Sequence, residues 1–293
     1  MTLEELLRSD GVVLLDGAMG TELDKRGKQG RAECNLSAPD SVIQVHRDYI
    51  RAGSDAVITN TLTMNRVFVE SHGLSIDVGK VNLAGARLAR EALEGKGFVL
   101  GNLSSTGQVL EPYGSFSERT VTDSFEEQAR FLQEGGVDGY IVETMFDLRE
   151  AVCALKACKA VSRLPVIVCI SYETEKNGGR TVMGNSAAEC AQILAAEGAD
   201  AIGANCGNVD PDQMAEIIAT LSRSTGLPIA AEPNAGKPRL SHGATVFDMD
   251  ARTFSSGVAN CRKAGATILG GCCGTSPEHI AALGEEVGHV AAR

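Results

Sequence analysis

Three cysteines stand where two expected strands end. Cys206 follows the apolar stretch 201–204, and the adjacent pair Cys272 and Cys273 lies among glycines directly after the run 266–269. Thiolates are strong zinc ligands, and a site with three protein ligands leaves a fourth position open. The pattern therefore predicts a thiolate-rich zinc centre that acts on a bound ligand rather than serving as a structural clamp.

A thiol in the open position would become a thiolate at neutral pH, because the metal lowers its pKa. Such a thiolate is a nucleophile toward an activated methyl group. Hydrolysis is less natural, because three thiolates quench much of the acidity of zinc. The alternative is that these cysteines are small buried apolar residues, and for Cys206 taken alone the two interpretations are balanced. We expect core or surface packing for five other cysteines, namely Cys153, Cys158, Cys169, Cys190 and Cys261.

The overall composition narrows the class of protein. The 293 residues are 43% hydrophobic and 22% charged, as in globular proteins with a large core. The net charge of −11 and the absence of a basic stripe argue against a nucleic-acid partner. No apolar run reaches the ~20 residues of a membrane helix, and residues 1–8 predict a short amphipathic helix rather than a signal peptide. Nine cysteines, an odd number, favour free thiols and metal ligation in a cytoplasmic protein.

Short β-branched runs alternate with helix-period segments along the chain. Expected strands occupy residues 12–16, 55–60, 98–102, 139–143, 166–171, 201–206, 229–232 and 267–270. Expected helices occupy residues 41–52, 78–93, 123–134, 148–161, 187–197, 210–222, 251–263 and 277–287. This alternation predicts one α/β domain over residues 1–293, a single (β/α)₈ TIM barrel. A doubly wound open sheet is the alternative, but no Gly-x-Gly-x-x-Gly follows the first strand.

A repeated spacing places four polar residues at one height. Glycines at positions 53, 136, 198 and 265 each end a helix before an even-numbered strand and suit a left-handed helix C-cap. Seven residues later come Asn60, Glu143, Asn205 and Cys272. Alternate strands of a TIM barrel contribute to the same layer, and active sites gather at the C-terminal strand ends. We therefore expect a shared site, although the repetition of helix–strand loops alone would explain the glycines.

Two further segments could bind a substrate. Glu143 ends an otherwise apolar strand, where an acid is costly unless it binds something, so we expect it to accept hydrogen bonds from a substrate ammonium. An ion pair at the barrel rim is the alternative. The run from Asp16 through Gly17, Ala18 and Met19 predicts a tight turn whose backbone N–H groups suit a carboxylate, while Asp16 could bind an amine. An ordinary loop is the alternative there.

Taken together, these residues resemble the homocysteine S-methyltransferase family, and most closely the homocysteine-binding barrel of cobalamin-dependent methionine synthase. Betaine–homocysteine methyltransferase is a more distant relative. The likeness extends from about residue 11 to 279. It rests on the segments 16–22, 46–47 with 53–55, 60–61, 143–144, 232–238 and 271–275.

The resemblance implies specific roles. Zinc would be held by Cys206, Cys272 and Cys273, with the homocysteine thiolate as fourth ligand. Asn234 would hold the open position until substrate displaces it, and Glu143 would bind the homocysteine amine. The loop from Asp16 to Met19 would hold the amino-acid end of the substrate.

We therefore expect a zinc-dependent methyltransferase that moves a methyl group to homocysteine and gives methionine. No folate- or cobalamin-binding module follows the barrel, so methylcobalamin, a corrinoid, would arrive on a separate protein, whereas standalone relatives can use a small sulfonium. The alternative is a component of a corrinoid-dependent system that demethylates a methyl ether or methylthiol and passes the methyl group to a separate corrinoid protein. A thiol-binding module without turnover and a purely structural zinc barrel are further alternatives.

Two segments depart from the family pattern. The family has Gly-x-x-Gly-Pro-x-Gly after the third strand, whereas residues 101–107 lack the Gly-Pro pair. Residues 62–65 are bulkier than the usual small residues. We expect both segments to face the substrate pocket and to bear on the identity of the substrate.

Overall fold

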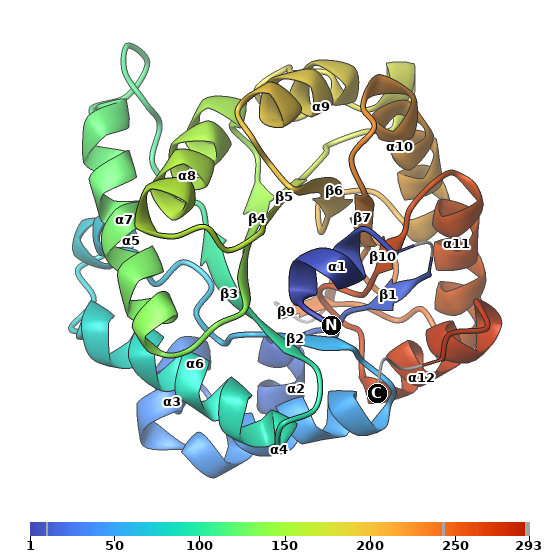
Figure 1. Ribbon diagram of the computed structural model, residues 1–293, viewed down its shortest axis with the longest axis horizontal. Helices are drawn as coiled ribbons and strands as arrows, with labels where there is room; N and C mark the ends of the chain where they lie inside the picture. Colours follow the sequence, from blue (N-terminus) through green and yellow to red (C-terminus); the bar gives the residue numbers. More distant parts are fainter. Residues whose placement is uncertain (10, 242–243, 291–293) are drawn as a thin grey trace.

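An eight-stranded parallel sheet curls around a central axis inside a ring of helices (Figure 1). The structure is a computed structural model that describes residues 1–9, 11–241 and 244–290. The strand order is β1-β10-β7-β6-β5-β4-β3-β2. From β2 to β10 the neighbours in the sheet follow one another along the chain, apart from the separate pair β8 and β9, and the last strand, β10, lies beside the first, β1. This arrangement confirms the predicted (β/α)₈ TIM barrel.

Each barrel strand lies within or overlaps a predicted strand. They are β1 (Val13–Leu14), β2 (Ala56–Ile58), β3 (Phe98–Ser104), β4 (Gly139–Met145), β5 (Val166–Ile170), β6 (Ala201–Asn205), β7 (Ile229–Glu232) and β10 (Ile268–Leu269). Their residues are almost all buried, because the surrounding helices and the barrel interior cover both faces of a parallel sheet.

The eight predicted helices are also present. They are α4 (Pro39–Arg51), α6 (Val78–Leu93), α7 (Glu118–Glu134), α8 (Leu148–Val161), α9 (Ala187–Ala196), α10 (Pro211–Ser224), α11 (Ala251–Lys263) and α12 (Pro277–Glu286). Helix α7 starts five residues before the prediction because Ser117 caps it, with its side chain accepting a hydrogen bond from the Thr120 N–H. None of the helices in the described part of the chain has the length and apolar character that a membrane crossing needs.

Several short elements escaped the sequence analysis. They are α2 (Met19–Lys25), η1 (Arg31–Glu33), α3 (Cys34–Ser37), α5 (Arg66–Ser71), η2 (Lys176–Gly178) and the hairpin of β8 (Arg239–Ser241) and β9 (Ala244–Val246). A pattern of apolar residues needs more than one or two helical turns to be recognised. Most of these elements lie in loops that follow barrel strands, where the substrate site is expected.

The predicted N-terminal helix, α1 (Leu3–Leu7), covers one end of the barrel (Figure 1). Leu3, Leu6 and Leu7 pack in one cluster with barrel-interior residues such as Leu15 and Ile141. This apolar plug closes the end of the barrel at which the strands begin. The opposite end, where the strands finish, is therefore the end open to a substrate.

Two carboxylates join the first and second strands, which stand at opposite ends of the sheet order. The Leu14 N–H donates to Asp55 Oδ2 at 2.9 Å, and the Asp55 N–H donates to the Leu14 carbonyl at 2.7 Å. The Ile58 N–H donates to Asp16 Oδ2 at 3.0 Å. His289 Nε2 lies 3.2 Å from Asp55 Oδ2, and this contact raises the pKa of His289. Side-chain carboxylates thus complete the barrel at this seam.

We predict that Asp55→Ala lowers the free energy of unfolding by about 1–3 kcal/mol, because it leaves the buried Leu14 N–H without its partner. The loss should be larger at about pH 5.5 than at about pH 9. His289 has a raised pKa, so its protonated form stabilises the fold at low pH, and that contribution disappears as the pH rises through its folded pKa.

Denaturant unfolding at both pH values measures this effect. The matched control is Asp123→Ala, which removes an exposed acid paired with Arg119 within one helix and should change stability by less than about 0.5 kcal/mol. Equal losses for the two variants would contradict the role of Asp55 in closing the barrel.

Candidate metal centre and substrate cavity

A cavity of about 660 Å³ opens where the barrel strands end. Seven of the nine predicted site residues line it, namely Gly17, Ala18, Met19, Glu143, Cys206, Cys272 and Cys273. The other two, Asp16 and Asn234, are buried and stand outside its lining. Most of the predicted site residues therefore lie together at this cavity, and Asp16 and Asn234 are buried outside its lining.

The three predicted zinc ligands lie together. The sulfur atoms of Cys206, Cys272 and Cys273 all lie within 4.8 Å of one another, although they come from the ends of β6 and β10. Tetrahedral zinc with Zn–S bonds of ~2.3 Å would place such sulfurs ~3.8 Å apart. The thiol cluster therefore fits the donor set and the spacing of a zinc site.

The close approach of the three thiols shifts the pKa values of Cys272 and Cys273 in opposite directions. Hydrogen bonds from Cys206 and Cys272 lower the pKa of Cys273 to about 3, and the positive charge of Arg31 acts in the same direction. The hydrogen bonds with Cys206 and Cys273 raise the pKa of Cys272 well above its usual range. Three thiols this close cannot all ionise without a compensating cation, which is what a metal ion would supply.

Asn234 lies beside the thiol cluster with one atom free. Its Nδ2 donates to the Gly207 carbonyl at 3.1 Å. Its Oδ1 is buried and has no hydrogen-bond partner among the described residues. A buried amide oxygen without a partner is costly, so this atom fits a ligand for the open position of a metal ion.

Glu143 is fixed by two amide side chains. Asn102 Nδ2 donates to its Oε1 at 2.7 Å, and Asn205 Nδ2 donates to its Oε2 at 2.8 Å. Burial raises the pKa of Glu143 to about 7, and the nearby Cys206 thiol acts in the same direction. The carboxylate lies in the cavity wall with no cation bound to it among the described residues, as expected for a group that binds a substrate ammonium.

Three of the four residues predicted to share a polar layer, namely Asn60, Glu143 and Cys272, line the cavity. Asn205 Nδ2 contacts both Glu143 and the Cys272 sulfur, the latter at 3.9 Å. The glycines that set this layer have the predicted left-handed backbone. Asn60 also lines the cavity, but its amide donates to the Arg31 carbonyl and to Asn35 instead.

The segment after β1 differs from the predicted turn. Met19 starts helix α2, and the Ala18 N–H, expected to be free for a carboxylate, donates to Thr275 Oγ1 at 3.0 Å. Gly17 is needed for close packing, because a Cβ there would lie 2.6 Å from Thr275 Oγ1 and 3.0 Å from the Tyr49 ring. The expectation of a free N–H is therefore wrong for Ala18, and a helix begins at Met19 where the turn was expected to continue.

Asp16 has a structural contact in place of a direct one with the cavity. One carboxylate oxygen accepts the Ile58 N–H, and the other is buried without a partner among the described residues. Burial raises the pKa of Asp16 well above its usual range. Burial also lowers the pKa of the neighbouring His46 to about 3, so that histidine carries no charge to compensate Asp16 at neutral pH.

Glu232 is a cavity residue to which the sequence analysis gave no role. It ends β7, is 1% exposed, and lies 3.8 Å from the Cys169 sulfur. Burial raises its pKa well above the usual range, and the charges of Glu143 and Asp16 add to this effect. The only sequence signal was its place at a strand end. With Glu143 and Asp16 it gives the barrel mouth three acids.

The two segments that depart from the family pattern behave differently. Leu62, Thr63 and Met64 line the cavity as predicted. In the other segment, residues 101–107, the prediction is confirmed for Asn102, which lines the cavity, and is wrong for the remaining residues, which are absent from the lining. Ser105 and Thr106 instead donate hydrogen bonds to Glu150, a buried acid of α8 that needs such partners.

Backbone strain concentrates at the cavity. Six non-glycine residues of the described chain have positive φ, and four of them line it: Arg31, Thr63, Thr144 and Cys206. Such conformations cost free energy and persist where the surrounding structure enforces them, often at functional sites. The strain therefore supports the same location for the site as the thiols do.

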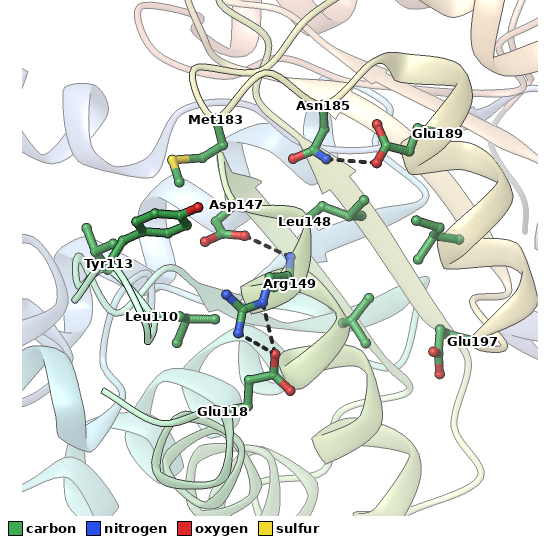
Figure 2. A pocket seen from close by; sticks show the side chains of 13 residues that line it. Leu110, Tyr113, Glu118, Asp147, Leu148, Arg149, Met183, Asn185, Glu189 and Glu197 are labelled. Atoms are coloured by element: carbon green, nitrogen blue, oxygen red, sulfur yellow. Dashed lines mark hydrogen bonds and ion pairs between the residues drawn. The ribbon is translucent and has the colours of Figure 1, made fainter. Parts of the chain in front are cut away.

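A second hollow of about 440 Å³ lies between α7, α8 and α9 (Figure 2). Arg149 points at Glu118 and pairs with it at 2.7 Å, while Asp147 caps α8. The exposed Tyr113 stands at its edge. Three charged side chains of this second hollow, Arg149, Glu118 and Asp147, thus have partners within the fold. The hollow contains none of the predicted site residues.

Comparison with known proteins gives matches along nearly the whole chain. The model of a family described as homocysteine S-methyltransferase matches residues 13–287. The methionine synthases of Mycobacterium tuberculosis and Mycobacterium leprae are both 30% identical to this chain over 96% and 92% of its length. The chain spans about a quarter of each, at 25% and 24%.

The fold has a counterpart among solved structures. The metallated form of the homocysteine methyltransferase MmuM from Escherichia coli superposes with a TM-score of 0.79 at 24% identity. The match covers 96% of this chain and 98% of that one. These findings confirm the family resemblance inferred from the sequence.

We predict that Asn205→Ala lowers the free energy of unfolding by about 1–3 kcal/mol, because it removes partners from Glu143 and from the Thr144 N–H inside the barrel. Asn208→Ala is the matched control, since its exposed amide bonds only Glu173, and it should cost less than about 0.5 kcal/mol. Thermal or denaturant unfolding compares the two, and a tolerated Asn205→Ala would mean that Glu143 does not depend on this clamp.

Proposed function

The chain belongs to the homocysteine S-methyltransferase family, and on that premise we propose that it is a zinc-dependent enzyme that transfers a methyl group to homocysteine to give methionine. The observation that carries the proposal is the convergence of Cys206, Cys272 and Cys273 beside Glu143 in one cavity. A thiol cluster supplies a metal site, and the fixed carboxylate supplies a site for an amine.

Zinc would be held by the three cysteines, with Asn234 Oδ1 at the fourth position in the absence of substrate. Zinc bound there would lower the pKa of a thiol and so favour the nucleophilic thiolate at neutral pH. The buried Asn234 oxygen without a partner and the spacing of the sulfur atoms support this assignment.

The protein's own groups would orient the substrate. Glu143, held by Asn102 and Asn205, accepts hydrogen bonds from the homocysteine ammonium. Gly17, Ala18 and Met19 line the same cavity, where they would face the amino-acid end. Fixing the ammonium restricts the position of the sulfur two carbons away from the Cα atom, which lowers the entropic cost of the reaction.

The transfer itself is a displacement at carbon. The thiol proton leaves to solvent, and the sulfur attacks the methyl carbon of the donor. A sulfur–carbon bond forms while the bond between methyl group and donor breaks, and its electron pair leaves with the donor. Either a small sulfonium or a methylcobalamin carried on a separate protein fits this scheme.

One feature of the cavity favours a second candidate function. Leu62, Thr63 and Met64 give the wall a bulky, partly apolar surface in a segment that departs from the family pattern. Such a surface suits a methyl ether or methylthiol, which the enzyme would demethylate while passing the methyl group to a separate corrinoid protein.

We predict that Cys272→Ser removes zinc and methyl transfer together. Metal analysis of the purified protein gives the zinc content, and homocysteine consumption gives the activity. Cys153→Ser is the matched control, because Cys153 is a buried thiol of α8 outside the cavity, and it should retain both. Full zinc content and full activity in Cys272→Ser would contradict the proposed mechanism.

We predict that the zinc-loaded enzyme forms methionine from homocysteine when a methyl donor is supplied. Parallel assays with S-methylmethionine, S-adenosylmethionine and a methylcobalamin-carrying protein identify the donor. Methionine formation with any of them supports the first candidate. Demethylation of a methylthiol in the presence of a corrinoid protein, with no methionine from any donor, would instead establish the second.

A further inference from the structure

Resting on the proposed function, we propose that Arg31 is a specificity-determining residue whose guanidinium binds the carboxylate of the thiol substrate. The enzyme would thereby select amino-acid thiols over thiols that carry only an amine.

Arg31 is the only Lys or Arg among the described residues that line the cavity. Its neighbours in that lining include the acids Glu33, Glu143 and Glu232. The guanidinium is exposed at the surface and forms no ion pair or hydrogen bond within the described chain. It is therefore available to an anion that enters the cavity.

The backbone at Arg31 is held by a buried amide platform. Arg31 has φ of 42°, a strained conformation for a residue with a side chain. Asn60 Nδ2 donates to its carbonyl at 2.8 Å, and Asn35 Oδ1 accepts a hydrogen bond from the same Asn60 amide at 3.0 Å. Asn35 Nδ2 in turn donates to the carbonyls of Asn60 and Val81, which joins the platform to α6. Two buried amides and a strained residue thus fix the start of a side chain that is itself unpaired.

The Arg31 side chain lies beside the segment that the family resemblance assigns to the amino-acid end of the substrate. Arg31 Nε lies 3.7 Å from the point where a Cβ on Gly20 would stand, so the side chain passes over the first turn of α2. Gly17, Ala18 and Met19, which the sequence assigns to the amino-acid end of the substrate, line the cavity beside it.

The charges form a complementary set around the thiols. Glu143 and Arg31 line the same cavity as the three thiols. Asn205 Nδ2 contacts both Glu143 Oε2, at 2.8 Å, and the Cys272 sulfur, at 3.9 Å. A carboxylate group and a guanidinium therefore share the cavity with the cluster of sulfur atoms. A ligand with a thiol, an ammonium and a carboxylate would satisfy all three, and a planar guanidinium binds a carboxylate through two parallel hydrogen bonds.

The test compares two thiols that differ only in the carboxylate, homocysteine and 3-mercaptopropylamine. Their dissociation constants are measured by calorimetry on the zinc-loaded protein and from the thiolate bands of the Co²⁺-loaded protein. We expect Arg31→Gln to weaken homocysteine binding about 10- to 100-fold and to change 3-mercaptopropylamine binding less than about twofold. Arg31→Lys should give an intermediate loss, because an ammonium keeps the positive charge but cannot form the two parallel hydrogen bonds of a planar guanidinium.

The matched control is Arg163→Gln, an exposed arginine between α8 and β5 at the opposite end of the barrel, which should leave both dissociation constants unchanged. An equal loss for both thiols in Arg31→Gln, an unchanged affinity for homocysteine, or an effect confined to the KM of the methyl donor would each overturn the assignment.

Failure of this assignment is separable from failure of the proposed function. If neither thiol perturbs the cobalt spectrum of the unmodified protein, the proposed function fails and the role of Arg31 fails with it. If both thiols bind and Arg31→Gln does not discriminate between them, only the role of Arg31 fails.

Discussion

The site depends on backbone hydrogen bonds made by one short segment, residues 232–235 at the end of β7. The Cys206 N–H donates to the Glu232 carbonyl at 3.1 Å, and the Cys272 N–H donates to the Pro233 carbonyl at 2.9 Å. The Ala235 N–H donates to the Cys273 carbonyl at 2.9 Å. Because β7 lies between β6 and β10 in the sheet, this segment acts as a spine to which both cysteine-bearing loops are hydrogen-bonded. The left-handed backbone at Cys206 is a strained conformation within this arrangement.

Side-chain hydrogen bonds explain how buried negative charge is tolerated in the mouth of the barrel. Asp16, Glu143 and Glu232 lie near one another, and burial raises the pKa of each. Only Glu143 has both oxygens held by amide donors, so it is the acid best prepared to remain ionised when a cation arrives. Asp16 contributes to barrel closure by accepting the Ile58 N–H. Its raised pKa suits a buried structural residue that does not line the cavity.

The sequence predicted most of what repeats in the fold and less of what is local. Eight strands and eight helices could be predicted because the apolar period persists over each element, and α6, α8 and α11 begin and end at the predicted residues. The cysteine cluster could be predicted because barrel geometry brings strand ends together. Arg31 could not, since it lies in a single 3₁₀ turn and its exposure gives no periodic signal. The partners of Ser105 and Thr106 were equally hidden, because Glu150 reads as an ordinary helix acid in the sequence.

The residues proposed to bind the metal and those proposed to select the substrate occupy different sectors of the barrel. The thiols and their spine come from β6, β7 and β10, where backbone hydrogen bonds leave little freedom. Arg31, Leu62 and Met64 come from the loops after β1 and β2, which are built from short helices. These loops pack on the segment after β3, since a Cβ on Gly107 would lie 3.4 Å from the His72 ring and 3.5 Å from the Phe68 ring, and these two rings stack. Under the proposed function, a substitution in the loops after β1 and β2 would therefore alter which thiol or methyl donor is accepted, while the three sulfur atoms, which come from the ends of β6 and β10, would keep their spacing.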